Sequence, residues 1–261
     1  MDSTPARPLV RLLHVTDTHL MSDPDGRYWG VHVRESFARV LAAARERHRP
    51  IAAWLLTGDL ADDGSPEAYR ALVAELDAQG VPAYLIPGNH DDSAMMARHA
   101  ATRTTRVGGS AVIGAWHLVL LDSVVPGATH GELGRERLAA LDAALAAHPR
   151  HPTLIAVHHH PLPVGSLWLD RLGLRDADTL FAVLARHPQV RAIVCGHIHQ
   201  EFDREHAGIR VLGTPSTCAQ FKPLSLPFLI EKDAAAGYRW LDLYADGTLV
   251  TGVERVGGRA P

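Results

Sequence analysis

The segment Cys195–Gln200, which reads CGHIHQ, places His197 and His199 on either side of one isoleucine, directly after a glycine. In a chain with 22 glycines and 17 histidines, composition alone predicts only roughly 0.1 chance occurrences of Gly-His-x-His. Imidazole binds zinc, iron, manganese and nickel, so this pattern indicates a metal site. If the backbone is extended here, both imidazoles face the metals and Ile198 faces the core.

Four other clusters of polar residues follow apolar runs in the same way. They are Thr16–His19, Thr57–Asp59, Pro87–Asp91 and His158–Pro161. Asp17-x-His19 is a weak signal by itself, because about one such triplet is expected by chance. Asn89 is more informative, since it is the only asparagine in the chain and lies between a glycine and a histidine. Ligands bind at the carboxyl ends of strands in open α/β sheets, so we expect all five loops to converge.

Seven side chains in these loops are candidate metal ligands. They are Asp17, His19, Asp59, Asn89, His158, His197 and His199. Seven ligands are too many for one ion, and two divalent ions sharing one carboxylate would divide the set as in two-metal hydrolases. Within the triple histidine we choose His158, because it comes first after the strand. Any one of these residues alone would more often be a turn or surface residue, so the inference depends on five loops occurring together.

The elements that must position these loops alternate between apolar runs and helix-periodic segments. We expect strands at 10–16, 53–57, 83–86, 111–113, 116–121, 154–157 and 190–194, and helices at 33–47, 66–76, 93–99, 135–147 and 176–186. The final third changes to strands joined by short turns, expected at 209–212, 228–231, 238–244 and 249–253. This rhythm indicates one α/β domain over residues 9–253, with flexible tails at 1–8 and 254–261.

Composition narrows the function classes. Lys and Arg number 26 against 29 Asp and Glu, which gives a formal net charge of −3, so we expect no nucleic-acid partner. Two cysteines, Cys195 and Cys218, are too few for a disulfide framework or a thiolate zinc site. With no signal-peptide pattern and no apolar stretch near the length of a membrane span, we expect a cytoplasmic protein. The sequence predicts nothing about the oligomeric state.

The order of the five blocks, D-x-H, G-D, G-N-H-D, H-H and G-H-x-H, resembles that of the calcineurin-like metallophosphoesterases. Four segments are similar to those of the bacterial class III 3′,5′-cyclic-AMP phosphodiesterases: His14–Leu20, His158–Pro163, Cys195–Glu201 and Thr214–Pro223. The resemblance covers residues 9–253 and implies a four-layer α/β/β/α sandwich, with two mixed β-sheets flanked by helices. It also places the loop Thr214–Pro223 near the rim of the pocket.

The resemblance further implies roles for individual residues. One metal ion would be held by Asp17, His19, Asp59 and His199, and a second by Asn89, His158 and His197, with Asp59 bridging the two. His90 matches a histidine that contacts the phosphate and is placed to protonate the leaving oxygen. The substrate would contact His19, Asp59, Asn89, His90 and His199. The two ions would be iron and/or manganese.

We therefore predict a hydrolase that converts 3′,5′-cyclic AMP to 5′-AMP by in-line attack of a metal-bridging hydroxide, with Asp59 and His90 as catalytic residues. A phosphodiesterase for 2′,3′-cyclic nucleotides or glycerophosphodiesters is an open alternative, because these activities share the same centre. A non-catalytic metal-binding scaffold is a second alternative. Such a scaffold should have broken ligand blocks, and all five blocks are intact here.

Overall fold

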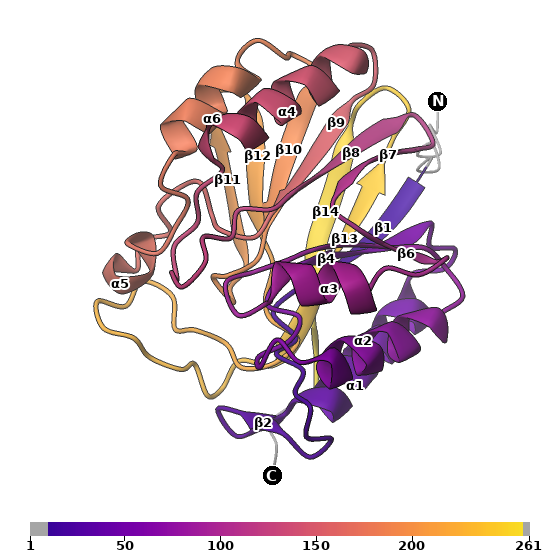
Figure 1. Cartoon of the computed structure of the whole chain (residues 1–261), viewed down its shortest axis with the longest axis vertical. Coiled ribbons are helices and arrows are strands. Elements are labelled where there is room, and N and C mark those ends of the chain that lie inside the picture. Colours follow the sequence, from indigo (N-terminus) through magenta and orange to yellow (C-terminus); the bar gives the residue numbers. More distant parts are fainter. Residues whose placement is uncertain (1–9, 258–261) are drawn as a thin grey trace, which may run out of the picture.

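Two mixed β-sheets pack face to face between layers of helices in the computed structural model, which describes residues 10–257 (Figure 1). The strands of the first sheet, in spatial order, are β14 (Leu249–Val256), β13 (Ala236–Leu243), β1 (Val10–Val15), β4 (Ala53–Thr57), β5 (Ala83–Ile86) and β6 (Thr105–Val107). Those of the second are β11 (Phe202–His206), β12 (Ile209–Gly213), β10 (Val190–Cys195), β9 (Thr153–Val157), β8 (Trp116–Leu121) and β7 (Gly109–Ile113). A separate ribbon is formed by β2 (Arg27–Tyr28) and β3 (Val31–His32).

The helices form the two outer layers. Those beside the first sheet are α1 (Val33–Arg47), α2 (Pro66–Asp77) and α3 (Ser93–His99), while α4 (Gly134–Ala147) and α6 (Ala177–Leu184) lie over the second sheet (Figure 1). The short helix α5 (Leu167–Asp170) lies apart from both groups. Helix α2 begins as its sequence predicts, because the Ser65 hydroxyl accepts a hydrogen bond from the Ala68 amide and Pro66 occupies the first turn.

Both sheets combine parallel and antiparallel pairs. In the first sheet β1, β4, β5 and β6 are parallel to one another, whereas β13 is antiparallel to both of its neighbours, β1 and β14. In the second sheet β8, β9, β10 and β12 are parallel, with β7 and β11 antiparallel at the edges. The carboxyl ends of β1, β4 and β5 therefore share one edge of the first sheet, and those of β9 and β10 share one edge of the second.

Adjacent side chains of the inner strands go to different layers, as the two-residue period of a strand requires. Leu12 and Leu55 face the core between the sheets, where they meet Leu154 of the second sheet. Leu13 and Leu56, one position further along each strand, pack against the helices outside the first sheet. A third apolar cluster joins the second sheet to α4 and α6. The predicted four-layer α/β/β/α sandwich is confirmed.

Two of the predicted elements are corrected. The strand expected at 228–231 does not form, and only an isolated bridge joins Phe221 to Ile230. Pro223 and Pro227 lack the backbone N–H that a ladder needs, and the segment between them forms a loop. The boundary predicted for the C-terminal tail, residue 254, was wrong, since β14 continues to Val256 and pairs with β13 there. The rest of that tail, 258–261, and the N-terminal tail, 1–8, lie outside the described residues.

Candidate metal centre

The five strand-end loops that the sequence singled out meet at one place, where the carboxyl ends of the two sheets come together. Loops after β1, β4 and β5 of the first sheet and after β9 and β10 of the second supply all seven candidate ligands: Asp17, His19, Asp59, Asn89, His158, His197 and His199. Six of the seven are buried, and Asn89 is half-buried. The predicted convergence is confirmed, although the residues come from positions up to 182 apart in sequence number (199 − 17).

One half of the site is built around His199. Its Nε2 atom lies 3.2 Å from Asp17 Oδ1 and 3.3 Å from His19 Nε2. The ligand atoms of these three residues all lie within 4.8 Å of one another, which is close enough for a single ion to contact them together. Asp59 Oδ2 lies 4.0 Å from His19 Nε2, on the side of this group that faces the other half of the site, which is built around His158.

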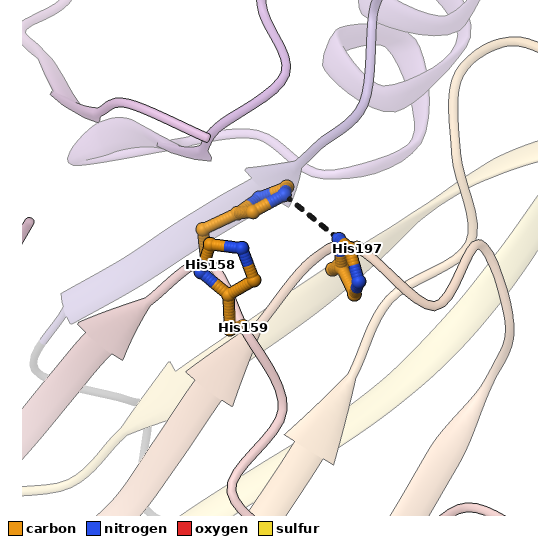
Figure 2. Close-up of side chains that lie close together, drawn as sticks. All are labelled: His158, His159 and His197. Carbon is orange, nitrogen blue, oxygen red and sulfur yellow. Dashed lines mark hydrogen bonds between the residues drawn. The ribbon is translucent and has the colours of Figure 1, made fainter. Parts of the chain in front are cut away.

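The other half is built around His158. Its Nε2 atom lies 3.3 Å from His197 Nδ1 (Figure 2). The same atom lies 3.2 Å from Asn89 Oδ1 and 3.4 Å from Asp59 Oδ1. Asp59 thus presents one carboxylate oxygen to each half of the site, which is the arrangement expected of a bridging ligand. His159 also lies near His197 (Figure 2), but its Nδ1 pairs with the Ser123 hydroxyl at 2.8 Å.

The donor set fits divalent ions, which the fold itself also implies. Two pairs of imidazole nitrogens face each other at 3.3 Å, and a carboxylate or amide oxygen approaches each pair. In three of the histidines the Nδ1 atom is held by an oxygen partner, which leaves Nε2 free to ligate. The partners are the Asp62 carboxylate at 3.0 Å from His19, the Thr57 carbonyl at 2.6 Å from His158 and the Ala219 carbonyl at 2.7 Å from His199.

Glycines permit the close approach of these loops. A Cβ atom on Gly88 would overlap the Asp59 carboxylate and lie 2.7 Å from His158 Cε1. A Cβ atom on Gly196 would overlap the Thr16 hydroxyl and lie 2.8 Å from Asp17 Oδ2. Both positions must therefore remain without a side chain for the two halves of the site to meet.

The backbone of the CGHIHQ segment differs from the prediction. His197 and His199 have φ angles of 68° and 48°, in the left-handed region, so the extended geometry expected here was wrong. The two imidazoles consequently turn to different halves of the site. Ile198 is fully buried, as predicted. Asp17 and Asp59 are also left-handed, with φ angles of 53° and 50°, and such strained positions are typical of functional sites.

His90 lies beside the candidate ligands and is anchored by a residue that the sequence reasoning missed. Its Nδ1 atom is 3.1 Å from Asp62 Oδ1, and the same oxygen is 3.0 Å from His19 Nδ1. The backbone N–H of His90 donates to Asp59 Oδ1 at 2.9 Å. The side chain of His90 is 36% exposed, so a substrate can reach it. The signal for Asp62 was its place three residues after Asp59, where a turn returns it to the same site.

Charge in the site is balanced between carboxylates and imidazoles. Burial lowers the pKa of His90, but the Asp62 hydrogen bond and the Asp59 charge outweigh it and raise this pKa to about 9. Burial likewise lowers the pKa of His158, and the neighbouring Asp59 raises it to about 9. Burial raises the pKa of Asp59, yet the charges of His158 and the other imidazoles bring it well below its usual range. The site therefore favours positive charge on His90 and His158, beside an ionised Asp59.

The segment Thr214–Pro223 contacts two of the candidate ligands, Asp17 and His199. The Ser216 hydroxyl donates to the Asp17 carbonyl at 2.7 Å, and the Ala219 carbonyl fixes His199. The Phe221 ring stacks on the His199 imidazole, with 3.9 Å between centroids and 6° between planes. The family resemblance placed this segment near the pocket but gave no role to its residues. Its contacts show that it fixes the positions of the candidate ligands Asp17 and His199.

The calcineurin-like phosphoesterase family matches residues 10–201, which is most of the chain. The chain belongs to this family. A 3′,5′-cyclic adenosine monophosphate phosphodiesterase, CpdA, from Escherichia coli K12 is 42% identical over 248 residues, covering 95% of this chain and 90% of the relative. A 3′,5′-cyclic-nucleotide phosphodiesterase from Nostoc sp. is 40% identical over 247 residues, covering 95% and 92%. The resemblance to bacterial cyclic-AMP phosphodiesterases is confirmed.

The fold is shared with a solved dimetal phosphatase from Danio rerio. That structure superposes with a TM-score of 0.72 at 16% identity and covers 95% of this chain and 96% of the phosphatase. The low identity makes this a likeness of fold. Within residues 10–257, every helix is too short or too polar to cross a membrane.

Proposed function

We propose that this chain hydrolyses 3′,5′-cyclic AMP to 5′-AMP and that it needs two divalent ions, iron and/or manganese, to do so. The observation that carries the proposal is the position of Asp59, with one carboxylate oxygen toward each of two groups of ligands. Relatives about 40% identical over nearly the whole chain are named as phosphodiesterases for this class of substrate, which supports the choice of substrate.

The ligands divide between the ions according to the two halves of the site. Asp17, His19, Asp59 and His199 would hold one ion, and Asn89, His158 and His197 the other, with Asp59 shared. When bound, the ions would supply hydroxide near neutral pH and Lewis-acid stabilisation of the phosphoryl oxygens. The substrate phosphate would lie against His19, Asp59, Asn89, His90 and His199.

His90 supplies the proton that the leaving oxygen needs. Hydrolysis breaks the bond between phosphorus and the 3′ oxygen of the ribose, and that oxygen leaves as a hydroxyl group. Asp62 holds His90 through Nδ1, so Nε2 is the atom left to donate the proton. Because Asp62 contacts His19 through the same oxygen, it couples the position of the proton donor to that of a ligand.

A substrate panel tests the proposal. The protein is stripped of metal, reloaded with manganese or iron, and assayed with cyclic AMP, cyclic GMP, 2′,3′-cyclic AMP and bis-p-nitrophenyl phosphate. We expect the highest kcat/KM with cyclic AMP. Equal kcat/KM for 2′,3′-cyclic AMP would instead favour the broader phosphodiesterase. Failure to hydrolyse any of the four at full metal loading would favour the non-catalytic scaffold. The cytoplasmic location and the lack of a nucleic-acid partner stay predictions.

A further inference from the structure

Six aromatic rings form a closed circle that runs from the candidate ligands to the protein surface. Centroid distances around the circle are 3.9 Å for His19–Tyr28, 6.3 Å for Tyr28–Trp29, 5.2 Å for Trp29–Phe228, 5.4 Å for Phe228–Phe221, 3.9 Å for Phe221–His199 and 5.3 Å for His199–His19. We call its four non-histidine members, Tyr28, Trp29, Phe221 and Phe228, the aromatic rim.

The rim changes from covered rings near the ligands to open rings at the surface. Tyr28 stacks flat on His19, with 8° between the planes, and Phe221 is only 8% exposed. Trp29 and Phe228, one ring further out, are 58% and 39% exposed. A substrate whose phosphate lies at the ligands therefore has aromatic surface within reach of whatever the phosphate is attached to.

The turn that carries Trp29 is unusual for such a residue. Trp29 and Gly30 join β2 to β3 with φ angles of 48° and 87°, as in a two-residue type I′ turn, which prefers Asn-Gly or Gly-Gly. The same kind of turn joins β11 to β12, and there the residue before Gly208 is Ala207, with a φ angle of 52°. The turn thus has no need of a tryptophan. A bulky residue that is both strained and exposed marks a candidate ligand contact.

Phe228 is held in position by the loop around it. The Lys222 amide donates to the Leu229 carbonyl at 2.8 Å and closes the loop at its base. The Ser225 hydroxyl accepts from Trp168 Nε1 at 3.3 Å, and the Trp168 ring packs edge-on against Phe228 with 5.0 Å between centroids. A ring fixed in this way loses little freedom when a ligand stacks on it.

We propose that the nucleobase of the substrate stacks on a platform formed by the exposed rings of Trp29 and Phe228 while its phosphate lies at the candidate ligands. The two ring centroids are 5.2 Å apart, so the rings contact each other and the base stacks on the pair and not between them. This inference rests on the proposed function, which supplies a substrate with a base. Exposed leucines nearby, such as Leu226, would suit an apolar partner equally well, but leucines do not form the ring-to-ring path that leads to His19 and His199. Stacking accepts any base, because every base has a π-face. The platform therefore contributes affinity for nucleotides over phosphodiesters that lack a base.

The variant Trp29→Asn tests the platform without disrupting the turn, since Asn-Gly is a preferred type I′ pair. We expect its melting temperature to be at least that of the wild type. With the metal-loaded protein, kcat/KM for cyclic AMP should fall about 5- to 150-fold, the range for loss of one stacked base. The fall should be far smaller for ribose 3′,5′-cyclic phosphate, which has the same scissile ring and no base. Phe228→Ala should show the same selective fall.

A matched control and a binding measurement complete the test. Leu226→Ala, in the same loop and 72% exposed in the native protein, should leave the ratio between the two substrates unchanged. Calorimetric binding of 5′-AMP should weaken in Trp29→Asn and hold in Leu226→Ala. Equal losses on both substrates, or unaltered 5′-AMP binding in Trp29→Asn, would overturn the platform. If the wild type does not hydrolyse cyclic AMP, the proposed function fails, and 5′-AMP binding still decides whether the platform binds a base.

Discussion

The Asp62 carboxylate offers a sharp perturbation, because a single oxygen serves two histidines. Oδ1 lies 3.0 Å from His19 Nδ1 and 3.1 Å from His90 Nδ1. The amide oxygen of Asp62→Asn can accept both hydrogen bonds and removes only the charge, whereas Asp62→Ala removes the contacts as well. Comparing the two variants separates the charge of Asp62 from its geometry.

The magnitudes follow from the kind of hydrogen bond. A bond to a charged group contributes ~1.5 to 3 kcal/mol and a neutral one about 1 kcal/mol. Losing the charge, a difference of about 0.5 to 2 kcal/mol, should therefore lower kcat for cyclic AMP by about 2- to 30-fold, since each ~1.4 kcal/mol is tenfold in rate. Losing the partner of His19 altogether should weaken metal binding about 10- to 100-fold. Asp62→Ala should accordingly be the more damaging of the two variants.

The pH profile gives an independent readout. Because His90 must be protonated to donate, kcat falls as pH rises through the pKa of His90. Asp62 raises that pKa, so in Asp62→Asn the alkaline limb should move to lower pH. The control is Asp63→Asn. In the native protein the Asp63 carboxylate accepts hydrogen bonds from the Ser22 and Ser65 amides. An Asp62→Ala enzyme with full kcat and metal affinity, or an Asp63→Asn enzyme with the same losses, would refute the reasoning.

Four further predictions concern the centre and the fold. Asp59→Ala should abolish both metal occupancy and turnover, as elemental analysis and kinetics would show, because it removes the shared carboxylate. His90→Ala should keep the metals and lower kcat for cyclic AMP about 10²- to 10⁴-fold; the loss should be smaller for bis-p-nitrophenyl phosphate, whose leaving group needs no proton, and equal losses would contradict the acid role. Gly88→Ala should fold yet bind metal weakly in a metal titration, because the new Cβ overlaps Asp59. Burial lowers the pKa of His117 to about 4, below its usual value near 6.5, so urea midpoints should fall as pH drops from 6.5 toward 4, and His117→Leu should flatten that decline.

Most of the site could be predicted from the sequence because its residues lie directly after the ends of strands. Asp59 and His158 each follow a fully buried strand, and Asp17 follows a strand in which only Arg11 is partly exposed. Parallel strands end on one edge whatever lies between them. The choice of His158 among three histidines stays a prediction, and in the structure its Nε2 atom lies 3.4 Å from Asp59 Oδ1 and 3.2 Å from Asn89 Oδ1. Strand ends define the candidate ligands, and the topology brings them together.

Residues that support the candidate ligands could not be found in this way. Tyr28 reaches His19 from a two-residue ribbon too short to leave a periodic signal, and its stacking depends on tertiary placement. The apolar run at 228–231 has the composition of a strand, but tertiary contacts keep it as a loop beside Trp168. The left-handed backbone of His197 likewise depends on a hydrogen bond from its amide to Asp17, far away in the sequence. Such features follow from contacts between segments that a linear pattern does not record.

The number of ions per chain tests the central claim most directly. Metal-stripped protein reloaded with manganese and freed of excess ion should contain two manganese ions per chain by elemental analysis, and a crystal grown under these conditions should show both ions on either side of the Asp59 carboxylate. One ion per chain, or two ions that do not share Asp59, would contradict the account.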